Sequence, residues 1–97
     1  MLRQDLLVNQ YDAIKKIVIE EAANNGFYPF PIEVKPSQFN NWKGQLYFSR
    51  ATPMGTDQLF VNFKSQGDKI SVYMYGAGTK ASPDSAIKAI TARLSQL

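Results

Sequence analysis

Residues 45–75 read QLYFSRATPMGTDQLFVNFKSQGDKISVYMY, and apolar and polar side chains alternate along most of this stretch. Alternation with a period of two is typical of β-strands that bury one face. Two segments with the composition of turns, Thr52-Pro53-Met54-Gly55-Thr56 and Ser65-Gln66-Gly67-Asp68, interrupt it. The stretch therefore predicts a three-stranded antiparallel meander, with strands at 45–50, 57–64 and 69–75.

Helical patterns flank this meander on both sides. From about Gln4 to Asn24, apolar residues recur every three or four positions, which places them on one face of a helix. Near the other end of the chain, Ser82-Pro83-Asp84 combines a capping hydroxyl, a proline and an acid, as at many helix starts. We expect a second helix from there to the C-terminus, with one apolar face. The predicted apolar faces consist of Leu7, Tyr11, Ile14, Val18 and Ala22 in the first helix and of Ile87, Ile90, Leu94 and Leu97 in the second.

The segment 27–34, FYPFPIEV, contains two prolines among large apolar residues. Proline has no backbone N–H to donate to a strand ladder, so this segment is expected to be an edge strand or an extended arm. Residues 35–42 follow as a polar connection.

These elements predict an α+β fold. We expect one domain, residues 1–97, as a two-layer sandwich in the order α-β-β-β-β-α, with an antiparallel sheet and both helices on one of its faces. Residues predicted to point at the helices are Leu46, Phe48, Leu59, Val61, Phe63, Ile70, Val72 and Met74. The opposite parity sends aromatic and polar residues to the other face of the sheet. The candidate partner-binding residues there are Tyr47, Phe60, Asn62, Lys64, Lys69, Tyr73 and Tyr75.

The composition argues against an enzyme. The chain of 97 residues contains no histidine and no cysteine, the side chains that most often transfer protons near neutral pH, ligate soft metals or act as strong nucleophiles. The acidic residues are dispersed, and none of their pairs has the pattern of a catalytic dyad or a metal cage. We therefore expect no catalytic residue, no metal and no cofactor.

Charge and hydropathy set the remaining limits. The formal net charge is +3, from 11 basic and 8 acidic residues, and the basic residues are scattered. This permits a nucleic-acid partner without demanding one. No stretch has the length of about 20 apolar residues that crosses a bilayer, so no membrane partner is expected. The lack of cysteine fits a cytoplasmic location.

The glycine-rich segment Gly76-Ala77-Gly78-Thr79-Lys80 lies just before the second predicted helix. Its spacing does not match a Walker loop or a dinucleotide fingerprint, so it is either a plain connection or a weak anion site. The sequence leaves this open.

Two functional hypotheses rest on the aromatic face of the sheet. In the first, a non-enzymatic interaction module presents that face to a protein partner or to a second copy of itself. In the alternative, the same aromatic residues stack on bases of a single-stranded nucleic acid, with help from Lys43, Arg50 and Lys64. The predicted architecture is shared by many unrelated small modules, including subunits of larger assemblies and phage-encoded inhibitors, and does not choose between these hypotheses.

Overall fold

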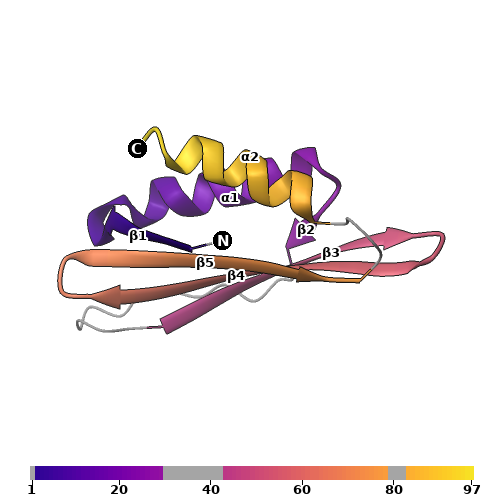
Figure 1. The fold of residues 1–97 in the computed structure, drawn as a ribbon, viewed down its shortest axis with the longest axis horizontal. Helices are drawn as coiled ribbons and strands as arrows, with labels where there is room; N and C mark the ends of the chain where they lie inside the picture. Colours follow the sequence, from indigo (N-terminus) through magenta and orange to yellow (C-terminus); the bar gives the residue numbers. More distant parts are fainter. Residues whose placement is uncertain (1, 30–42, 79–82) are drawn as a thin grey trace.

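The structure is a computed structural model that describes residues 2–29, 43–78 and 83–97, with side chains from Leu6 onward. The strands form one antiparallel sheet, and two helices complete the fold (Figure 1). In chain order the elements are β1 (Leu2–Leu7), η1 (Val8–Gln10), α1 (Tyr11–Asn24), β2 (Tyr28–Pro29), β3 (Lys43–Thr52), β4 (Gly55–Gln66), β5 (Lys69–Ala77) and α2 (Asp84–Leu94). The strand order across the sheet is β1-β5-β4-β3-β2. The predicted α+β class is confirmed.

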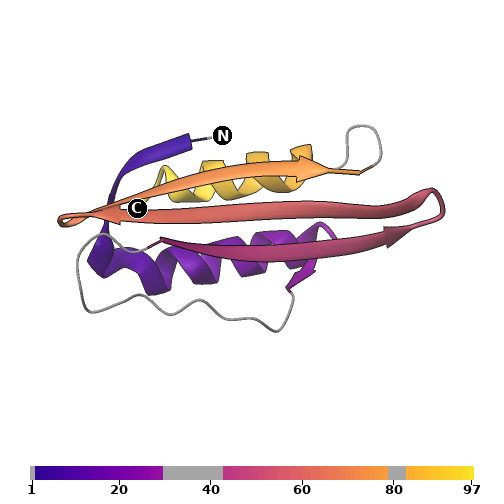
Figure 2. The same cartoon turned by 90° about the horizontal axis from the view of Figure 1, so that it is seen from below.

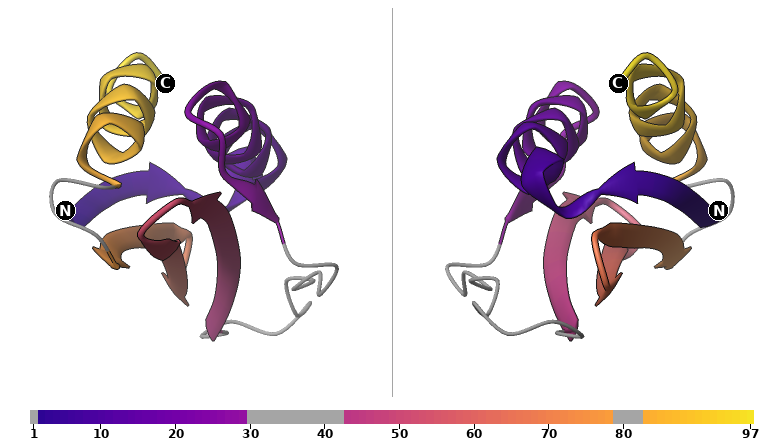
Figure 3. Two further views of the ribbon diagram at one scale, coloured as in Figure 1. Left: turned by 90° about the vertical axis from the view of Figure 1, so that its right-hand side faces the viewer. Right: turned by 90° about the vertical axis from the view of Figure 1, so that its left-hand side faces the viewer.

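Both helices lie on the same side of the sheet, next to each other and running in opposite directions (Figures 1 and 3). Seen from below, β3, β4 and β5 lie in front and both helices lie behind them (Figure 2). The structure is therefore two-layered, as predicted. Within the described ranges, neither helix has the length and apolar character needed to cross a bilayer.

The meander has the predicted parity of inward and outward residues. Leu46 pairs with Val61, and Val61 pairs with Met74, so the inward positions of three strands lie side by side. Every residue of the predicted inward set is buried. The helices contribute the other half of this core with Tyr11, Ile14, Ile17, Val18 and Ala22 from α1 and Ala86, Ile90 and Leu94 from α2. The ring of Tyr11 meets Phe63 edge-on, with 5.4 Å between ring centroids, and burial raises the pKa of Tyr11, with a smaller contribution from the charge of Asp12.

The N-terminal segment differs from the prediction. The first helix starts at Tyr11 and not near Gln4, because Leu2–Leu7 forms a strand paired with β5. This pairing provides hydrogen-bond partners for backbone groups along the edge of β5. The free energy gained from these tertiary contacts exceeds the local preference of the segment for a helix. The side-chain oxygen of Gln10 accepts a hydrogen bond from the Leu7 N–H at 3.0 Å, where the chain turns from strand into η1. Leu6 is buried in the core, whereas Leu7, assigned to the apolar face of a helix, is half-buried at the end of the strand.

The predicted edge strand begins as expected. Tyr28 and Pro29 pair with Ser49 and Phe48 at the β3 side of the sheet. The remainder of that strand and the polar connection that follows it, residues 30–42, lie outside the described residues. Phe27 is fully buried just before β2.

A charged pair ties the end of α1 to the β3–β4 hairpin. The guanidinium of Arg50 donates to Asp57 Oδ2 at 2.8 Å and to the carbonyl oxygen of Asn25 at 2.9 Å. It also lies 4.6 Å from the centroid of the Phe27 ring. Because Asp57 is completely buried, its carboxylate has lost its hydration, and the ion pair with Arg50 compensates for this loss.

We predict that Asp57→Asn lowers the free energy of unfolding by about 2–3 kcal/mol, because it keeps the shape but leaves the Arg50 charge without its carboxylate. Urea denaturation measures the change. Asp68→Asn, in the exposed β4–β5 turn, is the matched control and should be nearly neutral. Equal effects of the two substitutions would contradict this role of the pair.

The entry into α2 depends on close packing between β5 and Pro83. A Cβ atom on Gly76 would lie 1.7 Å from Pro83 Cγ, so only glycine leaves room for the proline ring. The backbone N–H of Ile87 donates to the Pro83 carbonyl at 2.9 Å and closes the first helical turn. The helix begins at Asp84, with Pro83 as its N-cap residue and not at its first helical position as expected, and Ser82 lies outside the described residues. The helix ends at Leu94, so the predicted continuation to the C-terminus is wrong, and Leu97 is exposed.

Gly76→Ala should destabilise the fold by about 1–3 kcal/mol through this overlap. A double-mutant cycle with Pro83→Ala isolates the contact, because removal of the ring relieves most of the clash. The cost of Gly76→Ala should therefore be smaller in the Pro83→Ala background, and an unchanged cost would show that the overlap is not the cause.

The two helices are joined at their surface by Arg93, which donates to Glu20 Oε2 at 2.8 Å and to Glu21 Oε1 at 3.2 Å. The hydrogen bond from Arg93 lowers the pKa of Glu20 below its ordinary value of 4.5. Near the other end of the helix pair, the Ser85 hydroxyl donates to Asn25 Oδ1 at 2.8 Å.

The lowered pKa of Glu20 gives a signed pH dependence. Its stabilising contribution is complete above the ordinary pKa and disappears as the pH falls through the lowered one. We expect Glu20→Gln to lower the melting temperature slightly at pH 7 and to have less effect below about pH 4, a small change because the pair is exposed. A difference between wild type and variant that stays constant across this range would contradict the assignment.

Candidate binding face of the sheet

The outer face is defined here as the side of β3, β4 and β5 that points away from both helices. Along each strand, buried residues alternate with half-buried or exposed ones. The structure therefore places all seven candidate residues, Tyr47, Phe60, Asn62, Lys64, Lys69, Tyr73 and Tyr75, on this face, with the parity that the sequence predicted.

Four aromatic rings form a continuous row on the outer face. Tyr47, Phe60 and Tyr75 occupy directly opposed positions on the three strands. The Phe60 centroid lies 5.0 Å from that of Tyr47 and 4.9 Å from that of Tyr75, and the rings of Phe60 and Tyr75 are stacked with 14° between their planes. Tyr73 extends the row along β5, 5.7 Å from Tyr75. These spacings are those of favourable aromatic pairs, so each ring helps to fix its neighbour.

The aromatic row is open to solvent at its β5 end. The exposed fractions are 47% for Tyr73 and 40% for Tyr75, whereas Tyr47 and Phe60 are half-buried. Next to the row, the Gln45 amide donates to Asn62 Oδ1 at 2.8 Å, and Asn62 is directly opposite Tyr73. The face thus combines apolar area with amide and hydroxyl groups.

Two lysines lie directly opposite each other on neighbouring strands. Lys43 on β3 pairs in register with Lys64 on β4, and both side chains are exposed. Opposed residues have Cβ atoms about 5 Å apart, so the two ammonium groups repel each other. Among the residues that the structure describes, no carboxylate lies within 4.0 Å of either ammonium group.

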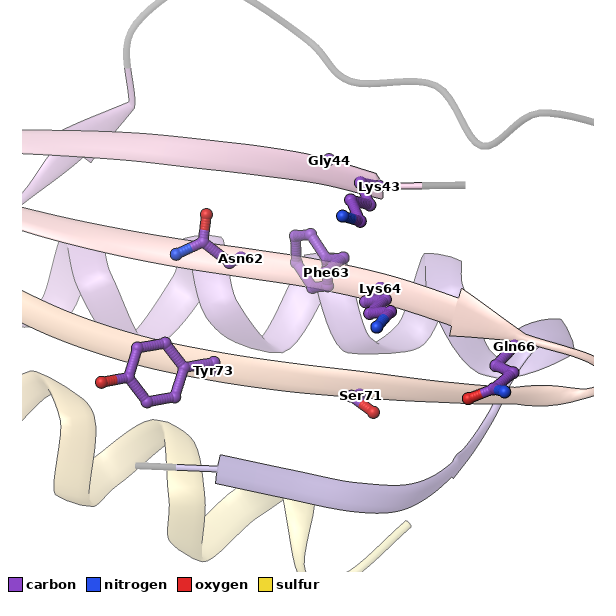
Figure 4. A pocket seen from close by; sticks show the side chains of 8 residues that line it. All are labelled: Lys43, Gly44, Asn62, Phe63, Lys64, Gln66, Ser71 and Tyr73. Carbon is purple, nitrogen blue, oxygen red and sulfur yellow. The ribbon is translucent and has the colours of Figure 1, made fainter. Parts of the chain in front are cut away.

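A hollow of about 430 Å³ opens at this end of the outer face, between the lysines and Tyr73 (Figure 4). Its walls come from three adjacent strands, and most of the lining side chains can donate hydrogen bonds. The lining residues are Lys43, Gly44, Asn62, Phe63, Lys64, Gln66, Ser71 and Tyr73.

The outer face carries no acidic residue on β3, β4 or β5, because Asp57 points inward to Arg50. The nearest acid along the chain is Asp68, in the turn that joins β4 to β5. It lines a separate hollow with Leu7, Val8, Asn9 and Gly67. The electrostatic character of the described outer face is therefore set by lysine alone.

The structure brings together most of the predicted site. The four aromatic residues form the row, and Asn62 and Lys64 line the hollow beside Tyr73. Lys69 is on the same face but lies at the β4–β5 turn, opposite Gln66, and does not line the hollow. Arg50, which was expected to assist nucleic-acid binding, is directed to the helix side by Asp57 and Asn25.

Sequence reasoning did not identify the hollow. Gly44, Gln66 and Ser71 contribute to it, and no residue pattern singles them out. The available signal was the parity of Gln66 and Ser71, which places both on the outer face. In the Gly76–Lys80 segment, considered above as a connection or a weak anion site, Thr79 and Lys80 lie outside the described residues.

Among the described residues, no group of three or more His, Cys, Asp or Glu side chains is arranged to hold a metal ion. Comparisons with protein-family models, curated proteins and solved structures found no match. The chemistry of this face is therefore inferred from its own geometry.

Proposed function

We propose that the protein is a non-enzymatic interaction module that binds another protein through the outer face of its sheet. The observation that supports this most directly is the aromatic row centred on Phe60. Phenylalanine has no polar group to gain from contact with water, and here it joins Tyr47 to Tyr75, which in turn contacts Tyr73. Tyrosine and phenylalanine are enriched at protein interfaces because they supply large contact areas through few rotatable bonds.

The charge of the outer face favours a partner other than a second copy. In a symmetric dimer, the same face is used by both subunits. Two such faces would bring lysines into one interface without supplying acids from β3, β4 or β5 to pair with them. A different protein with complementary charge avoids this cost.

The packing of the rings also favours a protein over a single-stranded nucleic acid. Bases bind to aromatic side chains by stacking on an open ring face. Phe60 already has a ring beside it on β3 and another on β5, at 5.0 and 4.9 Å. A base could stack on it only after displacing Tyr47 or Tyr75. An apolar side chain of a protein can instead pack along the exposed edges of the row.

The proposed location is the cytoplasm. It rests on the complete absence of cysteine, which fits a compartment where disulfides do not contribute to stability.

The test is a comparison of variants on and off the proposed face. We expect Phe60→Ala and Tyr73→Ala each to weaken binding of the partner by about tenfold or more, since central aromatic residues dominate interface energies. Met54→Ala is the control, because Met54 is 85% exposed at the β3–β4 turn and away from the row. A partner isolated from cells must be purified and titrated against all four proteins by calorimetry, with circular dichroism confirming that each variant is folded.

Two outcomes would contradict the proposal. The first is a directly binding partner whose affinity is unchanged by both face variants. The second is a stable homodimer of the isolated wild type, measured by light scattering, that Phe60→Ala converts to monomers, because a second copy would then occupy the face.

A further inference from the structure

We propose that the hollow between Lys43, Lys64 and Tyr73 is a carboxylate-binding site, which takes acidic side chains of a protein segment lying on the outer face. This inference rests on the proposed function and adds the chemical class of the partner. It is carried by three features of the hollow: a pair of cations that no described carboxylate compensates, a set of hydrogen-bond donors on adjacent strands, and direct continuity with the aromatic row.

The lysine pair indicates an anionic ligand. Like charges directly opposite each other on neighbouring strands destabilise a sheet, yet Lys43 and Lys64 occupy such positions. The part of the chain that the structure describes offers neither of them an ion pair. An anion that binds between the two ammonium groups converts their repulsion into two attractions. The repulsion between the two ammonium groups in the unbound protein is relieved when the anion binds, and this relief adds to the free energy of binding.

The donors around the lysines suit an oxyanion. Ser71 is directly opposite Lys64, so Lys43, Lys64 and Ser71 form one row across β3, β4 and β5. This row spans about 10 Å, because adjacent strands are about 4.8 Å apart. A carboxylate accepts several hydrogen bonds at once and binds most strongly to charged donors. Gln66 supplies a further polar group at the edge of the hollow, whereas the Tyr73 hydroxyl points away from the two lysines (Figure 4).

Tyr73 connects the hollow to the aromatic row. Its side chain lines the hollow, and its ring lies 5.7 Å from that of Tyr75. A ligand on this surface therefore meets cations and apolar rings next to each other. The matching partner segment has acidic residues beside an apolar or aromatic one.

The distribution of positive charge favours carboxylates of a protein over the phosphates of a nucleic acid. A nucleic-acid strand carries a charge at every nucleotide and is bound by cations along its whole length. Here the cations lie at one end of the outer face, while Ser49, Gln58 and Ala77 form an uncharged row on the other side of the aromatics. Arg50 cannot extend the basic surface, because Asp57 holds it on the helix side.

The experiment is a titration of the isotope-labelled protein with a hexaglutamate peptide that has blocked termini, followed by NMR. We expect amide shifts to cluster at Gly44, Lys64 and Ser71. Lys43→Gln combined with Lys64→Gln should weaken binding by about tenfold or more, the loss expected for one or two hydrogen bonds to a charged group.

The matched control is Lys16→Gln combined with Lys88→Gln, which removes the same net charge from exposed helix positions. This control should change the affinity less than about twofold, since exposed charges far from a site are screened by salt.

Three outcomes would overturn the inference. In one, both double variants lose affinity equally, so that net charge and not the hollow controls binding. In another, the amide shifts spread over all lysine-bearing surfaces. In the third, an oligothymidylate of matched charge binds the hollow more tightly than hexaglutamate, which makes nucleic acid the ligand.

The peptide titration does not involve the natural partner, so its failure leaves the proposed function standing as long as Phe60→Ala weakens partner binding. Conversely, hexaglutamate binding in the hollow together with no effect of Phe60→Ala on the partner would show an anion site without a docking face around it.

Discussion

The register between β3, β4 and β5 is the constraint on which the rest of the structure depends. Because successive side chains of a strand point to opposite faces, one register choice separates the core from the outer face. With Leu46 opposite Val61 and Val61 opposite Met74, the apolar set is buried under the helices. The same register aligns Tyr47, Phe60 and Tyr75 in a row on the other side. Core packing therefore fixes the geometry of the proposed binding face without any residue of that face contributing to the core.

The edges of the sheet and the helix ends hold this arrangement in place. β1 covers the edge of β5, and β2 pairs at the β3 side. Arg50 and Asp57 attach the end of α1 to the β3–β4 hairpin on the helix side. The only charged side chains left on the outer face of the three central strands are lysines, and the hollow forms where two of them lie opposite each other. The acid of these strands therefore lies on the helix side, and the lysines lie on the outer face.

The meander, the second helix up to Leu94 and the parity of every inward residue could be predicted from the sequence, because alternation, helical periodicity and turn composition are local signals. The start of the first helix could not. Leu7 fits the helical spacing of Tyr11 and Ile14, and only the pairing of Leu2–Leu7 with β5, more than sixty positions away, makes that segment a strand. The pairing of Lys43 with Lys64 could not be predicted from local sequence either, since it depends on which residue of β3 is opposite Lys64. Arg50 shares the parity of Leu46 and Phe48 and points inward, contrary to its expected help in nucleic-acid binding, and its ion pair with Asp57 depends on the hairpin register.

Because the chain contains no cysteine, a single-cysteine scan of positions 58–64 in β4 tests the register most directly. Each variant would be exposed to a water-soluble thiol reagent under native conditions, and the labelling rates compared. We predict fast labelling at 58, 60, 62 and 64 and strong protection at 59, 61 and 63. Protection of the even positions with fast labelling of the odd ones would place the aromatic row under the helices and contradict the proposed binding face.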